Sequence, residues 1–303
     1  MNFDNWKPRS HYMGLLMTDG RGKSNLEKFN EAKIKWRTKL DEFTAMTDKQ
    51  KDLKMGAKAL QASDDAKAEM DRLKDLIHIE NIGDTCKSKL SEIHTELTQG
   101  RKRVIESDYL TKGLMVEEDS ITLYSVFTGE FHKKNELQGE NDWITGMMDF
   151  EWIDMVIDTK SSWDIHTFNN TKRKPILSLY QWQLDCYMWL YNKTHARLVY
   201  CLINTPEHLI RAQETKLMYK LFGSESNFSM APQYMLDAFE DAKKELRKNH
   251  IFDDLSLNQK IKVFDVERDE SRIERIKKRV EYCRWYLNNI DNESLNTDES
   301  ETE

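Results

Sequence analysis

The fold is organised around residues 142–163, DWITGMMDFEWIDMVIDTKSSW. This stretch holds two short apolar segments, and each carries an acid, Asp149 or Asp158, where a buried strand would normally place a hydrophobic side chain. Because a Glu-Trp-Ile-Asp turn separates the segments, we expect two adjacent antiparallel strands. Their pairing would bring Asp149, Asp158 and Lys160 close together. Two carboxylates and an ammonium in a half-buried place are typical of a site for metal and water.

The chain on both sides of this stretch alternates between extended and helical patterns. The expected strands are 130–138, 143–151 and 155–160, which form a meander, and then 196–204 and 262–267. The expected helices are 108–127, an aromatic helix over 178–192, most of 207–250 with a break from Gly223 to Pro232, and 270–290. Residues 164–176 are polar and predict a loop. This order predicts an α/β fold with a mixed central sheet flanked by helices.

The first hundred residues predict a helical arm or cap. Ser24 and Glu27 match a capping box at the start of a helix. Residues 47–100 contain no proline and predict two or three charged helices with thin apolar stripes. At the other end, residues 291–303 carry six acids and no Lys or Arg, so we expect them to be disordered. The predicted organisation is an arm over 1–100, a core over 101–290 and an acidic tail over 291–303.

The composition limits the class of protein. The 303 residues are 39% hydrophobic and 33% charged, which is enough apolar material for a core beneath a charged surface. No apolar run approaches membrane length, and the start lacks the core of a signal peptide, so we expect a cytoplasmic protein without membrane association. The net charge is −7, and removing the six acids of the tail leaves residues 1–290 near −1. A near-neutral body permits DNA binding through a local basic track and argues against indiscriminate coating of DNA.

The four cysteines do not form a recognisable metal or disulfide pattern. They are spread along the chain, and none lies in a C-x-x-C pair: Cys86, Cys186, Cys201 and Cys283. We therefore expect buried, reduced thiols.

Asp149 and Asp158 are candidate ligands for a hard divalent cation. Mg²⁺ prefers oxygen ligands, usually one or two carboxylates together with water and a substrate phosphate. Lys160 lies two residues after Asp158 on the same expected strand, so both side chains point to the same face. From there the ammonium could hold a water or stabilise charge that develops on a phosphate. The alternative is a structural ion pair at the end of a strand.

Two further features accompany these residues. Upstream, the expected helix before the meander carries Glu117 with Glu118 beside it, and either side chain could point inward. Downstream, Gln183 and Tyr187 lie four residues apart and therefore share one helix face. Taken singly, Glu117 is typical of a surface acid, and Gln183 and Tyr187 are typical of a helix that packs through its aromatic residues. Together, in this order, they support a site.

The combined series resembles the motifs of the PD-(D/E)XK (restriction-endonuclease-like) nucleases, and it is most similar to the RecB-like and lambda-exonuclease-like (YqaJ) branch. The matching strings are KGLMVE, GMMD, VIDTKSS and QWQLDCY, and with the strand that ends in INTP they span about 110–204. Two departures stand out. Asp158 occupies a position where many relatives have Glu, and the histidine that some RecB-type members place before the first acid has no clear counterpart, since His94 lies too far upstream.

The resemblance implies a role for each matching residue. It implies that Glu117, Asp149, Asp158 and the Thr159 carbonyl ligate one or two Mg²⁺ ions, for which Mn²⁺ would substitute. Lys160 would orient the attacking water. Gln183 would support the site or contact DNA, and Tyr187 would pack near it. Basic residues that flank the motifs could follow the phosphates: Arg101, Lys102 and Arg103, then Lys133 and Lys134, and the run Lys172, Arg173 and Lys174.

The function implied by the resemblance is a Mg²⁺-dependent DNA exonuclease that hydrolyses phosphodiester bonds at DNA ends, in phage-type recombination or DNA processing. For a phage-encoded protein the location would be the host cytoplasm. By the same analogy, the partners would include a single-strand annealing protein, and the chain would form a homo-oligomer. Two alternatives stay open: a single-strand or structure-specific endonuclease of the same fold, and a non-catalytic protein that uses the nuclease fold to bind DNA or a partner.

Overall fold

The structure is a computed structural model that describes residues 1–104, 107–171 and 176–291. The chain divides into two compact units: Leu16–Ser91 forms one, and Met1–Leu15 together with the described residues from Glu92 onward forms the other. The predicted arm covered residues 1–100, whereas residues 1–15 and 92–100 belong to the unit that holds the sheet. Among the described helices, none has both the length and the apolar character needed to cross a lipid bilayer.

The larger unit is built on a four-stranded mixed sheet, as the sequence predicts. The strands follow the order β3 (Phe150–Trp152), β4 (Met155–Ser161), β5 (His195–Cys201) and β6 (Ile261–Glu267). The β3–β4 and β5–β6 pairs are antiparallel, and the central β4–β5 pair is parallel, with Asp158 opposite Leu198. A parallel pair needs a crossover connection, and α9 (Ser178–Leu190) lies in the crossover between β4 and β5.

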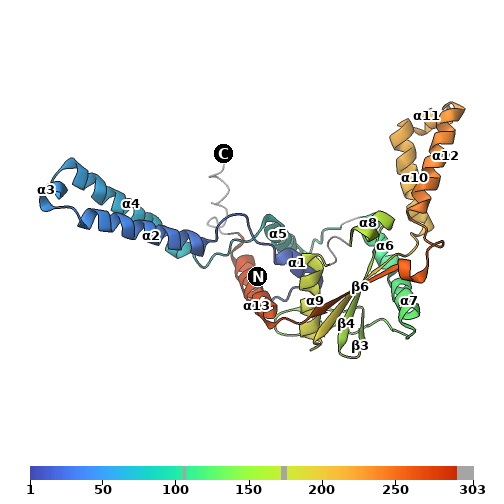
Figure 1. Ribbon diagram of the computed structural model, residues 1–303, viewed down its shortest axis with the longest axis horizontal. Coiled ribbons are helices and arrows are strands. Elements are labelled where there is room, and N and C mark those ends of the chain that lie inside the picture. Colours follow the sequence, from blue (N-terminus) through green and yellow to red (C-terminus); the bar gives the residue numbers. More distant parts are fainter. Residues whose placement is uncertain (105–106, 172–175, 292–303) are drawn as a thin grey trace. The chain divides into compact units, whose positions relative to one another are not determined.

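Helices cover both faces of this sheet, because successive side chains of each strand point to opposite faces. On one face, Leu184 and Met188 of α9 pack with Val156 and Leu198. On the other face, α7 (Glu117–Thr128) contributes its own apolar side chains. Figure 1 shows α9 and α7 on opposite sides of the strands. The second apolar cluster contains Ile121, Tyr124, Phe150, Ile157, Val199, Cys201 and Ile261.

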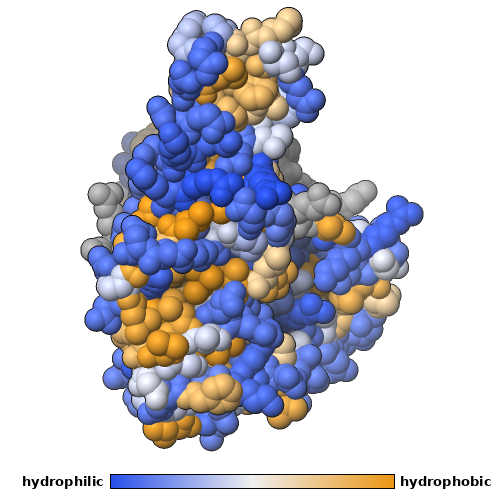
Figure 2. All heavy atoms as spheres, turned by 90° about the vertical axis from the view of Figure 1, so that its right-hand side faces the viewer, coloured by the Kyte–Doolittle hydropathy of each residue, from blue (hydrophilic) through white to orange (hydrophobic). Residues whose placement is uncertain are grey.

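The remaining elements of this unit surround the sheet. A helical hairpin between β5 and β6 consists of α10 (Glu207–Phe222), α11 (Glu225–Ser229) and α12 (Gln233–Lys248). Its end exposes apolar side chains such as Met230, which is 76% exposed, and Figure 2 shows apolar atoms gathered there, at the top of the view. The other elements are η1 (Ser10–Tyr12), α6 (Asp108–Met115), β1 (Gly139–Glu140), β2 (Thr145–Gly146), α8 (Ile165–Asn170), η2 (Leu257–Gln259) and α13 (Glu270–Asn289).

The smaller unit is a pair of long helices, α2 (Asn25–Thr44) and α4 (Lys54–Leu76), with α3 (Asp48–Lys51) between them. The predicted capping box is confirmed, since the Ser24 hydroxyl accepts from the Glu27 backbone N–H and the Glu27 carboxylate accepts from the Ser24 backbone N–H. Asn25 donates to the carbonyls of Leu76 and Ile79 and so joins the start of α2 to the end of α4. Two helices, α1 (Met13–Leu16) and α5 (Asp84–Gln99), cross the division between the units.

Two predictions around the sheet are wrong. Residues 130–138 are not a strand, because Phe131 and Leu137 are 89% and 76% exposed and the segment therefore has no apolar face to bury. The predicted strand over 143–151 is interrupted, and only residues 145–146 and 150–152 pair. Asp149 consequently lies in the connection immediately before β3 and not within a strand.

Two helix predictions also need correction. The expected helix over 108–127 breaks at Val116, whose φ of −107° and ψ of 17° lie outside the helical range, and α6 and α7 are separate helices. The expected loop over 164–176 contains α8, which starts because the Asp164 carboxylate accepts from the Thr167 backbone N–H at 2.7 Å.

Candidate active site

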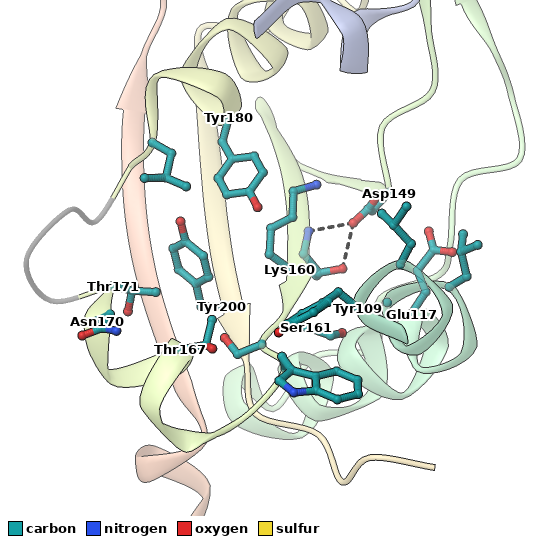
Figure 3. Close-up of a pocket in the computed structure, with 17 residues that line it drawn as sticks. Tyr109, Glu117, Asp149, Lys160, Ser161, Thr167, Asn170, Thr171, Tyr180 and Tyr200 are labelled. Atoms are coloured by element: carbon teal, nitrogen blue, oxygen red, sulfur yellow. Dashed lines mark hydrogen bonds between the residues drawn. The ribbon is translucent and has the colours of Figure 1, made fainter. Parts of the chain in front are cut away.

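The site lies where β4 extends beyond its neighbour β3. The two strands pair only as far as Ile157, so among the described residues no strand adjoins Thr159 on that side. Asp149 takes this place. Its Oδ2 accepts from the Thr159 backbone N–H at 2.6 Å and from the Thr159 hydroxyl at 2.7 Å, as the dashed lines in Figure 3 show. The open edge of β4 therefore holds Asp149 beside Thr159, between Asp158 and Lys160 in the sequence.

Asp158 is a buried acid that lacks the usual partners. It is 1% exposed, and neither of its carboxylate oxygens has a hydrogen-bond partner among the described residues. The Lys160 ammonium lies 2.7 Å from Oδ2 as an ion pair that lacks the geometry of a directed hydrogen bond. A buried polar atom without a hydrogen bond is costly, so this arrangement indicates that another group satisfies Asp158 in the working protein.

Crowded charges shift the proton affinities of these groups. Burial, with the neighbouring charge of Asp158, raises the pKa of the Asp149 carboxyl to about 7. Burial alone would lower the pKa of the Lys160 ammonium, but the charges of Asp158 and Asp149 outweigh it and raise that pKa. Lysine is therefore charged at neutral pH, and the two acids together attract a further cation.

Glu117 is the third acid of the predicted set, and it reaches the same pocket from the start of α7. Glu118 is exposed and does not line the pocket, so Glu117 is the inward one of the two. Lys134 lies 2.7 Å from Glu117 Oε2. Within the part of the chain that the structure describes, no three His, Cys, Asp or Glu side chains form a group that could hold a metal. The structure therefore brings Asp149 and Asp158 together with Lys160 and pairs Glu117 with a lysine.

The site opens into a pocket of about 850 Å³ whose lining combines aromatic and aliphatic side chains with polar and charged ones. Figure 3 shows Tyr180 and Tyr200 on one side and Tyr109 and Glu117 on the other, with Lys160 between them. Tyr109 also packs against Trp163, with ring centroids 4.8 Å apart. An ammonium beside aromatic side chains suits a ligand with both an anionic and a planar part.

Gln183 and Tyr187 form a buried, hydrogen-bonded pair on α9. Gln183 Nε2 donates to the Tyr187 hydroxyl at 2.8 Å, and the two residues are 8% and 4% exposed. Burial raises the pKa of the Tyr187 phenol, and the charge of Asp158 adds to this effect. Of the two roles considered for Gln183, its burial favours support of the site over contact with DNA.

Lys112 is a buried residue that contacts two residues of the pocket wall, and the motifs do not single it out. Its side chain is fully buried, and its ammonium donates to the carbonyls of Ser162 and Trp163, both at 2.8 Å. Burial lowers the pKa of this ammonium to about 7. The lysine ties α6 to the turn that follows β4. It lies within the KGLMVE string, but a single lysine on a helix carries no sequence signal of burial.

The predicted basic run Lys172, Arg173 and Lys174 lies outside the described residues. Thr171, directly before the run, and Leu177, three residues after it, line the pocket.

The carboxylates of this site fit a divalent cation. Mg²⁺ is commonly held by one or two carboxylates with several waters, and Asp158 presents two buried oxygens without hydrogen bonds while Asp149 engages only Oδ2.

Comparison with solved structures shows which fold the chain has. No family model matches the chain, and no curated protein matches it significantly. A phage-related exonuclease from Haemophilus somnus 129PT is similar over 96% of this chain and 97% of its own, with 20% identity and a TM-score of 0.58. An alkaline exonuclease from Laribacter hongkongensis, LHK-Exo, is similar over 73% of this chain and 89% of its own, with 13% identity and a TM-score of 0.46. The first likeness confirms the fold class that the sequence predicts.

Proposed function

We propose that the chain is a metal-dependent deoxyribonuclease that uses Mg²⁺, or Mn²⁺ in its place, and that acts as an exonuclease at DNA ends. The observation that carries the proposal is Asp158, a fully buried carboxylate without hydrogen bonds, beside Asp149 and Lys160 at the open edge of β4. The fold that the chain shares with a phage-related exonuclease supports the same conclusion.

Asp149, Asp158 and the carbonyl of Thr159 would hold the cation. When bound, a divalent ion lowers the pKa of a coordinated water and neutralises charge on the scissile phosphate. The chain's own contribution is preorganisation. The two hydrogen bonds from Thr159 fix the Asp149 carboxylate, and Gln183 and Tyr187 are held by their own hydrogen bond. No side chain then has to reorganise as the phosphate reacts.

Lys160 would orient the attacking water and stabilise the developing negative charge. Its ammonium lines the pocket, lies 2.7 Å from Asp158 and sits 5.2 Å from the centre of the Tyr180 ring. These contacts hold a proton on Lys160 Nζ, so the lysine donates hydrogen bonds and does not act as the base.

The pocket walls support action at a strand end. Tyr109, Trp163, Tyr180 and Tyr200 offer flat surfaces within the pocket that contains Lys160. The terminal base of a duplex is stacked on one face only and unpairs more easily than an internal base, so it can enter such a pocket at a lower cost than a base that must leave the stack on both sides. A single-strand or structure-specific endonuclease remains the second candidate, because single-stranded substrate also presents free bases.

The biological setting follows from the same proposal. We place the enzyme in phage-type recombination or DNA processing, in the cytoplasm, with a single-strand annealing protein as a partner and a homo-oligomer as the assembly. The likeness to a phage-related exonuclease supports this setting.

A pair of DNA substrates tests the exonuclease proposal. Purified protein with Mg²⁺ should release mononucleotides from linear duplex DNA and leave a covalently closed circle of the same sequence intact, and EDTA should stop the reaction. Cutting of the closed circle would support the endonuclease instead. Absence of any Mg²⁺- or Mn²⁺-dependent loss of DNA would leave the non-catalytic alternative.

A further inference from the structure

Glu117 has a cation beside it that comes from the chain itself. Lys134 Nζ lies 2.7 Å from Glu117 Oε2, and the two side chains are 34% and 27% exposed. Partial burial distinguishes this pair from the exposed ion pairs of the helices, where solvent competes with the contact. The pair lies at the edge of the pocket that Glu117 and Asp149 both line.

The backbone holds Lys134 at this edge. The Asn135 backbone N–H donates to the Asp149 carbonyl at 2.6 Å, and Asn135 Nδ2 donates to the Met148 carbonyl at 3.3 Å. Asn135, which directly follows Lys134, is thus hydrogen-bonded to Asp149, a proposed metal ligand.

The charges of the site then balance for one divalent ion. Three carboxylates, those of Glu117, Asp149 and Asp158, face two ammonium groups, those of Lys134 and Lys160. One divalent cation and one phosphodiester would bring this set to neutrality, whereas a second divalent ion would leave an excess of two positive charges.

Resting on the proposed nuclease function, we propose that Lys134 occupies the place of a second metal at Glu117, so that the site binds a single divalent ion at Asp149 and Asp158. The ammonium neutralises Glu117 and repels a further cation from that carboxylate. Lys134 is therefore a residue that sets the metal stoichiometry, and it does not itself take part in the reaction.

Mn²⁺ titration of the full-length protein without DNA tests this inference, with bound ion counted by electron paramagnetic resonance. The wild type should bind one Mn²⁺ per chain. Lys134→Met and Lys134→Gln should bind a second, because Glu117 is released. In the wild type this second site should be weaker by at least about a hundredfold. Lys134→Arg, which keeps the charge, should bind one, and the adjacent exposed Lys133→Met serves as the matched control and should also bind one.

The outcomes separate this inference from the proposed function. Two Mn²⁺ ions of similar affinity in the wild type, or a single ion in both Lys134→Met and Lys134→Gln, would overturn the role of Lys134. The proposed metal site itself has a different test. In a chain that keeps Lys134, Asp158→Asn should abolish Mn²⁺ binding. Retained binding in that variant, or none in the wild type, would overturn both proposals.

Discussion

Replacing Lys112 with methionine should remove a pH-dependent component of stability. Methionine has a similar length and volume, so it should fill the same space within the core next to α6. The native ammonium is fully buried and donates to the Ser162 and Trp163 carbonyls. The substitution leaves these two carbonyls without their donor, which costs on the order of 1 kcal/mol or more for each. That cost does not depend on pH, whereas the effect of the ammonium does.

The sign follows from the proton affinities of the two states. Burial lowers the pKa of Lys112 to about 7 in the folded chain, against roughly 10.4 in an unfolded one. Between these values the unfolded state binds more protons, so the free energy of unfolding rises with pH. Because of this difference in proton binding, the free energy of unfolding of the wild type should rise by roughly 2 kcal/mol between pH 7 and pH 9. Methionine does not titrate, so the Lys112→Met variant should lack this rise in unfolding free energy.

Urea unfolding at pH 7, 8 and 9 measures the difference. Tryptophan fluorescence follows the larger unit, since Trp36 is the one tryptophan of eight that lies in residues 16–91. The gap in stability between wild type and Lys112→Met should widen by roughly 2 kcal/mol in favour of the wild type over this range. The exposed Lys220→Met variant should instead run parallel to the wild type. Parallel curves for Lys112→Met would refute the reasoning.

Three other substitutions probe the site. Thr159→Val should remove the hydroxyl bond to Asp149, lower stability by about 1 kcal/mol and slow DNA hydrolysis about tenfold; unchanged kinetics would show that this bond does not position the acid. Gln183→Leu should cost about 1 kcal/mol of unfolding free energy because the Tyr187 hydroxyl loses its donor, and a thermal melt that matches wild type would argue against that support. Lys160→Met should destabilise the metal-free chain by about 3 kcal/mol because the buried Asp158 loses its ion-pair partner, and adding Asp158→Asn should recover most of the loss; additive effects in this double-mutant cycle would contradict the ion pair.

Local patterns predicted most of the fold. The alternation around Val156 and Ile157 identified β4, and the aromatic periodicity over 178–192 identified α9, because both elements bury apolar side chains at a regular spacing. The expected antiparallel pairing on the two sides of the turn at 151–154 also predicted that Asp149 lies beside the strand that carries Asp158. These features are encoded within short segments, which is why the sequence alone reveals them.

Other features depend on tertiary contacts that no local pattern records. The break at Val116 turns one expected helix into two, and the extended segment over 130–138 pairs with no strand in the described chain. Lys112 and Lys134 each look like surface lysines in the sequence, yet one is fully buried and the other pairs with Glu117. Their positions follow from the packing of α6 against β4 and from the attachment of Asn135 to Asp149.

The measurement that tests the central claim most directly is degradation of linear duplex DNA by wild type, Asp158→Ala and Lys160→Ala, with and without divalent metal. All three proteins are checked for a cooperative thermal transition, so that loss of fold is not mistaken for loss of chemistry. We predict that the wild type degrades DNA only with Mg²⁺ or Mn²⁺ and that each substitution abolishes this activity. Metal-independent degradation, or full activity in either folded variant, would contradict a metal-dependent nuclease site at Asp158 and Lys160.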